Sequence, residues 1–316
     1  MKSLHPSVGI DVSSDELILS FGDAKSHSFA NSAEGCKEIL HLLPAKSQVH
    51  LETSGGYERL LVRTLRNAGH TVNCHNALRA KRLAQATGGR AKTDALDAKA
   101  LARTGPQLPT HTPKSPERED LADLSRAISE LKEAARRMKT RSGRPGLDQA
   151  AKELYERVEV NLRREAQLAS QTFSKRVKED QELWRRHSLA LSVRGVGPEL
   201  ARVCLCELPE DFQGRTPGEI ASFAGLAPMD DQSGRRRGAS RIRQGNDRLK
   251  AALYMPAMST VRCEAWAKNT YTKLITSGRN HRQAIIAVMR KLLLRIVAVL
   301  KRGTPWQNDP PQPLKA

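Results

Sequence analysis

Short runs rich in β-branched and apolar residues alternate with helical patterns over residues 7–104. The β-rich runs are Ser7–Val12, Glu16–Phe21, Val49–Glu52 and Thr71–Cys74. Gly55-Gly56 ends the fourth strand, and leucines then recur at helical spacing within Tyr57–Ala68. We therefore predict the element order β-β-β-α-β-α-β-α and an α/β domain.

The middle third of the chain has the pattern of two long helices. Four prolines between Thr104 and Pro116 exclude a helix or a central strand, so we place a domain boundary there. Beyond it, apolar residues recur at alternating steps of three and four, the spacing of a coiled-coil seam. They are Leu121, Leu124, Ile128, Leu131, Ala135 and Met138. Ser142–Gly146 breaks this helix, and a periodic run from Leu147 to about Trp184 predicts an antiparallel hairpin.

The hairpin has two interpretations, a solvated pair of charged helices or an oligomer contact through its apolar seam, and the seam favours the second. Residues 189–303 indicate another globular, mainly helical unit. Its last helix carries an apolar stripe from Ile285 to Leu300 that is typical of a core, and Gly303 and Pro305 end it. The predicted domains are thus 1–104, 105–188 and 189–316.

Gly195-Val196-Gly197-Pro198 lies between apolar runs, like the turn of a DNA-binding helical hairpin whose backbone amides approach a phosphate. A plain helix-capping turn explains these four residues equally well. The motif is therefore only a weak indication of DNA binding.

The charge of the chain indicates a polyanionic partner. Lysine and arginine number 53 against 34 acids, a net charge of +19, of which +11 falls in residues 191–316. A merely soluble basic protein is the alternative. Only twelve residues are aromatic, so phosphate contacts must dominate over base stacking. Five cysteines without paired spacing favour a reduced cytosol, and no apolar stretch predicts secretion or a membrane span.

Four carboxylates stand out as candidate metal ligands. Asp11 and Glu52 each end a predicted strand, where ligands commonly bind in α/β folds. Asp94 and Asp97 are three residues apart on a predicted helix and share a face. Each acid alone is more simply a helix cap or a surface charge, but four converging carboxylates repel unless divalent cations neutralise them. The set predicts Mg²⁺, or Mn²⁺ in its place, and phosphoryl-transfer chemistry.

These motifs resemble the DEDD transposase family, which includes Piv-like DNA invertases and RNA-guided bridge recombinases. The similar segments in the first half are Gly9-Ile10-Asp11, Glu52-Thr53-Ser54-Gly55 and Lys92-Thr93-Asp94-Ala95-Leu96-Asp97-Ala98. Those in the second half are Gly225–Pro228, Ser233-Gly234, Arg237–Arg241 and Ala252–Ala257. The resemblance extends through the whole chain and implies an N-terminal RuvC-like domain of RNase H fold.

A strongly basic run surrounds Ser240. Its seven cations, which we expect to contact nucleic-acid phosphates, are Arg235, Arg236, Arg237, Arg241, Arg243, Arg248 and Lys250. From the residues alone, Ser240 is better explained as a helix N-cap than as a nucleophile. The family resemblance reverses this preference, since Ser240 matches the serine that family members join covalently to DNA. Ser233, before Gly234 in a predicted turn, is the rival and is interpreted as structural.

The sequence therefore predicts a transposase, a site-specific DNA recombinase of an insertion sequence. Ser240 would cut DNA through a phosphoserine, with metal held by Asp11, Glu52, Asp94 and Asp97 and without ATP. The resemblance further implies a dimer or tetramer and a structured noncoding guide RNA, and we expect a cytoplasmic, nucleoid-associated protein. One alternative is a RuvC-like endonuclease that hydrolyses DNA with metal-activated water. The other is a non-enzymatic nucleic-acid-binding protein.

Overall fold

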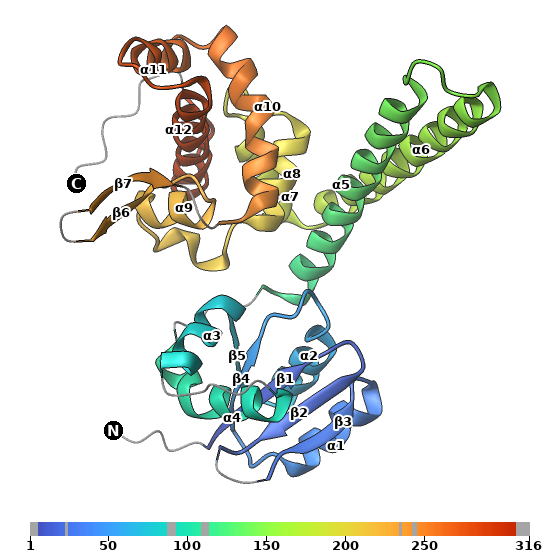
Figure 1. Cartoon of the computed structure of the whole chain (residues 1–316), viewed down its shortest axis with the longest axis vertical. Coiled ribbons are helices and arrows are strands. Elements are labelled where there is room, and N and C mark those ends of the chain that lie inside the picture. Colours follow the sequence, from blue (N-terminus) through green and yellow to red (C-terminus); the bar gives the residue numbers. More distant parts are fainter. Residues whose placement is uncertain are drawn as a thin grey trace. The chain divides into compact units, whose positions relative to one another are not determined.

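The computed structural model of the protein describes residues 6–22, 25–86, 93–108, 114–233, 236–241 and 245–307. At residues 78, 84–86, 229–233 and 236–241 it describes the backbone alone. The chain divides into two compact units, residues 1–113 and 114–316 (Figure 1). Each unit has a hydrophobic core of its own. The division into three domains stays a prediction.

A five-stranded mixed sheet forms the centre of the first unit, in the order β3-β2-β1-β4-β5. Its strands are β1 (Ser7–Val12), β2 (Glu16–Ser20), β3 (His27–Ala30), β4 (Gln48–Glu52) and β5 (Thr71–His75). The first three pair antiparallel, whereas β1, β4 and β5 run parallel. The helices are α1 (Ala33–Leu42), α2 (Arg59–Asn67), α3 (Ala77–Ala86) and α4 (Asp94–Thr104), followed by the 3₁₀ turn η1 (Gly105–Gln107). The predicted α/β class is confirmed, as is the element order through β5, after which two helices follow where the predicted order has one.

The two faces of this sheet are covered by different helices. Val8 and Ile10 of β1 point into a core that includes Ile39 of α1 and Leu65 of α2. Successive side chains of a strand point to opposite faces, so Gly9 faces the other way, and there the backbone of α4 packs against it. One face is thus a hydrophobic core, and the other carries the helix with the predicted acidic pair.

A helical hairpin begins the second unit, made of α5 (Pro116–Ser142) and α6 (Gln149–Glu179) (Figure 1). Three residues of the predicted seam, Leu121, Ile128 and Ala135, are buried. The prediction that the second helix continues to about Trp184 is wrong. Asp180 interrupts it, because its carboxylate accepts hydrogen bonds from the amides of Glu182 and Leu183 and begins α7. Supercoiling of the pair stays a prediction.

The rest of the second unit is mainly helical, as predicted. Its elements are α7 (Gln181–Leu191), α8 (Pro198–Glu207), η2 (Glu210–Gln213), α9 (Pro217–Phe223), α10 (Asp247–Cys263), α11 (Ala265–Thr276) and α12 (His281–Arg302). Helix α12 is the core helix expected from its apolar stripe, and Gly303 ends it in the left-handed conformation, with φ 71°.

A two-stranded ribbon also belongs to this unit and was not predicted. Its strands are β6 (Met229–Ser233) and β7 (Arg236–Arg241). β6 is mostly polar and β7 contains three arginines, so both lack the alternating apolar pattern that marks a half-buried strand. None of the described helices is long and apolar enough to cross a membrane.

Candidate functional site

Asp11 and Glu52 lie beside each other at one end of the first unit's sheet, on two of its interior strands. Ile10 of β1 pairs with Leu51 of β4 in parallel register, so the next residues, Asp11 and Glu52, occupy neighbouring positions at the carboxyl ends of the two strands. Ile10 and Leu51 point into the core, and both acids therefore emerge on the opposite face. Each is half-buried.

Helix α4 brings Asp94 and Asp97 to the same end of the sheet. The Ser7 hydroxyl donates to the carbonyl of Ala102, 2.7 Å away, near the end of α4. A Cβ on Gly9 would point at the backbone of Ala98 and Ala102. The helix therefore runs antiparallel to β1, and its first turn, with Asp94 exposed and Asp97 half-buried, lies toward Asp11. Negative charge is also favoured at a helix N-terminus by the helix dipole, whatever else these acids do.

The loops that follow the two strands are tied together. Oε2 of Glu58 accepts hydrogen bonds from the Ser54 amide (3.1 Å), the Ser54 hydroxyl (2.9 Å) and the Gly56 amide (2.9 Å). The side-chain amide of Asn31 donates to the carbonyls of Ser13 (2.8 Å) and Tyr57 (3.1 Å). These bonds fix the backbone after Asp11 relative to the backbone after Glu52.

A buried histidine pair, which the sequence did not reveal, lies on the same face of the sheet. Nδ1 of His50 is 2.9 Å from Nε2 of His75, and the rings stack with their planes 9° apart. Burial, and secondarily the charge of His75, lowers the pKa of His50 to about 4. His50 is therefore neutral at neutral pH. The pair connects β4 to β5 next to Glu52, since His50 is two residues before Glu52 and His75 is its register partner on β5.

The four predicted ligands share one end of the sheet but are not assembled into a compact metal centre. Among the residues that the structure describes, no group of three or more His, Cys, Asp or Glu side chains is placed to hold a metal. Their type still fits a hard cation, because carboxylate oxygens are the ligands that Mg²⁺ and Ca²⁺ take. Their role as metal ligands stays a prediction.

Ser240 lies in strand β7, so its interpretation as a helix N-cap is wrong. The N-cap of the next helix, α10, is Asn246, whose side chain accepts from the Leu249 amide at 2.9 Å. The Asn246 side chain also donates to Glu207 (2.8 Å), so the backbone just after the ribbon is anchored to α8. The side chains of Ser240 and Ser233 are outside the described part of the structure, as is the turn expected at Gly234.

The predicted phosphate-binding cations are only partly described. Arg235 and Arg243 lie outside the described residues, and only the backbone is described for Arg236, Arg237 and Arg241 in β7. Arg248 is exposed on the first turn of α10. Lys250 forms an ion pair with Asp247 at 2.8 Å.

The glycine-containing turn joins α7 to α8, as the sequence suggested for a helical hairpin. Gly195 has a φ of +88°, and a Cβ there would lie 2.2 Å from the hydroxyl of Thr260 on α10. Gly197 is the N-cap of α8, and no side chain accepts from the first amides of that helix. Such uncapped amides can bind a phosphate oxygen.

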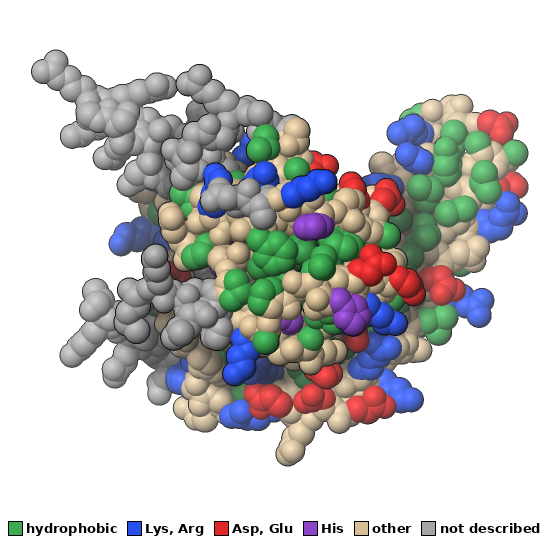
Figure 2. All heavy atoms as spheres, turned by 90° about the horizontal axis from the view of Figure 1, so that it is seen from below, with side chains coloured by type: hydrophobic (Ala, Val, Ile, Leu, Met, Phe, Trp, Pro, Cys, Tyr) green, Lys and Arg blue, Asp and Glu red, His purple; other side chains and the backbone are tan. Residues whose placement is uncertain are grey.

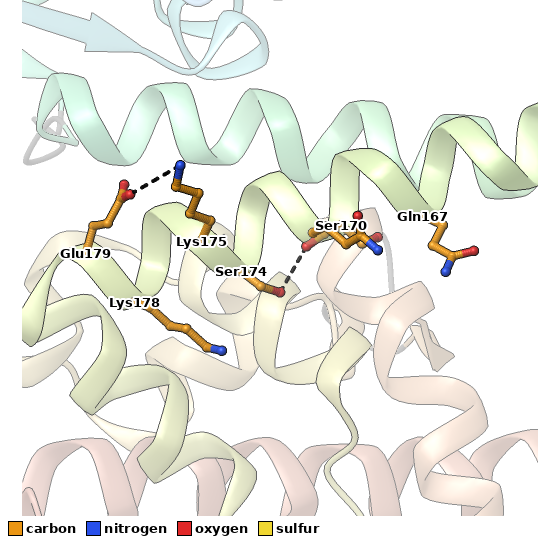
Figure 3. A pocket seen from close by; sticks show the side chains of 7 residues that line it. Gln167, Ser170, Ser174, Lys175, Lys178 and Glu179 are labelled. Atoms are coloured by element: carbon orange, nitrogen blue, oxygen red, sulfur yellow. Dashed lines mark hydrogen bonds and ion pairs between the residues drawn. The ribbon is translucent and has the colours of Figure 1, made fainter.

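Neither the face drawn in Figure 2 nor the hollow drawn in Figure 3 is a further binding site. On the face drawn in Figure 2, Lys and Arg side chains are interspersed with Asp and Glu, so no large basic patch gathers there. A hollow of about 610 Å³ follows helix α6 (Figure 3). Figure 3 shows Lys175 directed toward Glu179 and Ser174 toward Ser170. All its lining residues come from this one helix, so it is an open helix face and not a binding pocket.

Two transposase family models match this chain. A family model of DEDD transposases of the IS110 type matches residues 8–145. The model described as the transposase IS116/IS110/IS902 family matches residues 187–272. The chain is thus similar to IS110-type DEDD transposases in both its first and its second half.

Relatives support this family across the chain's length. The pilin gene-inverting proteins of Moraxella bovis and Moraxella lacunata are each 28% identical over 328 residues, 95% of this chain and 97% of theirs. A 43.6 kDa protein of insertion element IS110 from Streptomyces coelicolor is 30% identical over 121 residues, which is 38% of this chain and 30% of its own length. Divalent-metal dependence is general in DEDD transposases.

Proposed function

We propose that the protein is a DEDD transposase, a site-specific recombinase that cuts DNA by attack of Ser240 on a phosphodiester and rejoins the strands in a new order. The observation that carries the proposal is the neighbouring position of Asp11 and Glu52 at the ends of two parallel strands, with the acidic first turn of α4 at the same end. The sheet is mixed, and its first three strands along the chain pair antiparallel. This arrangement also supports the RNase H-like interpretation of the unit.

Asp11, Glu52, Asp94 and Asp97 would hold Mg²⁺, or Mn²⁺ in its place. When bound, divalent cations stabilise the negative charge on the attacking and leaving oxygens of a phosphodiester. The chain's own contribution is to fix the ligands. The hydrogen bonds of Glu58 and Asn31 hold the loops that follow Asp11 and Glu52 in the chain. The packing of α4 against Gly9 sets the position of Asp97.

Ser240 would supply the nucleophile from the arginine-rich ribbon. Its oxygen forms a bond to phosphorus while the strand's own oxygen leaves as a free hydroxyl. The phosphoserine keeps the energy of the broken bond, so rejoining needs no ATP. Cationic side chains of the same ribbon would stabilise the charge that develops on the phosphate. Asn246 and Glu207 support this role, because they anchor the backbone that follows the ribbon.

Three partners belong to the proposal. DNA is bound as element ends and target, through the basic run 235–250 and the turn between α7 and α8. The name of the Moraxella relatives describes inversion of a pilin gene, which supports site-specific recombination here. A structured guide RNA is proposed from the family resemblance, and a dimer or tetramer from the seam of the α5–α6 hairpin. Copurification of a discrete RNA, and loss of recombination after ribonuclease treatment, would test the guide.

The metal site is tested with isosteric variants. Asp11→Asn and Glu52→Gln should each lower strand cleavage in Mg²⁺ by on the order of 10²–10³-fold, as for loss of one charge-stabilising group. DNA affinity should persist, because docking rests on phosphate contacts. The matched control is Asp15→Asn, at an exposed acid on the turn after β1, and it should cleave normally. Full cleavage by Asp11→Asn would refute the metal site.

A further inference from the structure

The last two helices, α11 and α12, carry a large cationic charge and no acid of their own, although Glu264 at the N-cap of α11 acts on Arg295. Residues 265–307 contain nine lysines and arginines and no Asp or Glu. They are Lys268, Lys273, Arg279, Arg282, Arg290, Lys291, Arg295, Lys301 and Arg302. In the described part of the chain, none of the nine forms a salt bridge. This charge is separate from the basic run around Ser240.

Four of these cations form what we call the ridge: Lys273 on α11 and Lys291, Arg295 and Arg302 on α12. The three on α12 follow at steps of four and seven residues, which places them on one stripe of the helix. Lys291 Nζ donates to Thr270 Oγ1 at 2.8 Å, and Lys273 follows one turn after Thr270 on α11. Lys291 and Arg295 of the ridge thus contact α11, and the stripe continues along α12 to Arg302. Lys273, Lys291 and Arg302 are exposed.

The ridge cations act on one another. Partial burial, followed by the charges of Arg295 and Lys273, lowers the pKa of Lys291. The Arg295 guanidinium lies 3.6 Å from the ring centroid of Trp266 and 5.3 Å from that of Trp306. Contact with aromatic rings holds a guanidinium in place without neutralising it. The fold therefore fixes several like charges together, an arrangement that an anion would stabilise.

The ridge adjoins the glycine turn between α7 and α8. Arg194, just before Gly195, pairs with Glu264 at the start of α11 at 3.3 Å. The Trp306 amide donates to the hydroxyl of Ser192, the C-cap of α7, at 2.8 Å. Trp306 therefore contacts both Arg295 of the ridge and the end of α7, which precedes the turn. The turn and the ridge both attract phosphates.

We propose that the ridge binds the phosphate backbone of duplex DNA, as a second contact track beside the 235–250 run. Single-stranded nucleic acid is bound largely by bases stacked on open aromatic faces. Trp266 cannot serve in this way on the face that Arg295 covers. The choice of DNA over RNA rests on the proposed recombinase function. The charge and contacts of the ridge do not depend on that function.

The test replaces the three exposed ridge cations together in the full-length protein, as Lys273→Gln, Lys291→Gln and Arg302→Gln. The control removes the same charge from exposed, unbridged cations of the α5–α6 hairpin, as Lys139→Gln, Arg144→Gln and Lys152→Gln. Affinity for a labelled duplex DNA is measured by fluorescence anisotropy over a salt series. Each lost phosphate contact reduces the slope of log affinity against log salt by about 0.9, so the ridge variant should lose about 2.7.

The control should keep the wild-type slope, and Lys273→Arg with Lys291→Arg should keep it too, because charge is retained. An unchanged slope in the ridge variant, or an equal loss in the control, would overturn the proposal. Weakened binding of a duplex RNA with DNA binding intact would also overturn it. Strand transfer by Ser240 is measured in a separate assay. An unchanged salt slope in the ridge variant would refute the ridge proposal without affecting the recombinase proposal. Loss of strand transfer would bear on the recombinase proposal without changing the salt slope of DNA binding.

Discussion

The contact between Gly9 and α4 gives a direct test of how the acidic residues are positioned. A Cβ at residue 9 would lie 2.0 Å from the carbonyl oxygen of Ala98 and 2.4 Å from the amide nitrogen of Ala102. Both atoms are backbone, so no side-chain rotation relieves the clash. Gly9→Ala must therefore push α4 away from β1. The distance from the Cβ to the Ala98 oxygen would be about 1.4 Å shorter than the 3.4 Å at which ordinary van der Waals contact begins.

Two magnitudes follow from this displacement. Overpacking of this kind destabilises a protein by about 1–3 kcal/mol. Asp97 moves with α4 while Asp11 and Glu52 stay on the sheet, and a misplacement of about 1 Å lowers catalysis by on the order of 10²-fold. We thus expect Gly9→Ala to lose strand cleavage well beyond what its reduced folded population explains.

The assay separates the two units. All three tryptophans, Trp184, Trp266 and Trp306, lie in the second unit, so their emission during urea unfolding reports that unit alone. Hydrogen exchange of peptides from β1 and α4 reports the first. Gly9→Ala should accelerate exchange there and leave the tryptophan transition unchanged. The control is Gly143→Ala, where φ is −83° and the nearest atom would be 3.6 Å away.

The reasoning would be refuted if Gly9→Ala matched the wild type in both exchange and cleavage. Faster exchange with full cleavage would refute the narrower claim that α4 places a functional carboxylate. In either case the Gly143→Ala control should remain as stable as the wild type and fully active.

Three further predictions concern the second unit. Arg202→Met should lower the free energy of unfolding by about 2 kcal/mol, because the buried guanidinium donates to the carbonyl and hydroxyl of Ser125. Hydrogen bonds from a charged group contribute about 1.5–3 kcal/mol. A change of less than about 0.5 kcal/mol in urea unfolding would contradict this prediction. Alkylation should label exposed Cys263 well before Cys204, because burial raises the pKa of Cys204 to about 12 and leaves little thiolate; equal rates in mass spectrometry would contradict the burial. Replacing Arg235–Arg237 together should flatten the salt dependence of DNA binding by about 2.7, and an unchanged slope would place the contact elsewhere.

The order of elements in the first unit was largely predictable because β1, β2, β4 and β5 are short runs rich in apolar residues, whereas the mostly exposed β3 gave no such run. The positions of Asp11 and Glu52 at strand ends followed from that pattern alone. Their side-by-side placement depends on the parallel register of β1 and β4, which is a long-range pairing. The proximity of His50 and His75 has the same origin, and no local signal marks it.

The errors in the second unit have local causes. The β6–β7 ribbon lacks an apolar face, so periodicity could not distinguish it from a loop, and the residues alone favoured a helix cap at Ser240 before the family resemblance reversed that preference. The break at Asp180 arises from one capping carboxylate within an otherwise continuous helical pattern. The ridge could have been found from the sequence, since residues 265–307 hold no acid. Its alignment depends on how α11 packs against α12.

The central claim is that the Ser240 hydroxyl becomes bonded to a DNA phosphate. The measurement is denaturing gel electrophoresis of labelled target DNA incubated with the full-length protein and Mg²⁺, followed by protease digestion and mass spectrometry of the adducted peptide. The account predicts an adduct at Ser240 that Ser240→Ala abolishes together with strand transfer, whereas Ser233→Ala keeps both and Ser240→Cys retains a trace. Cleavage by Ser240→Ala with free phosphate ends and no attached protein would contradict it and would establish a hydrolytic nuclease instead.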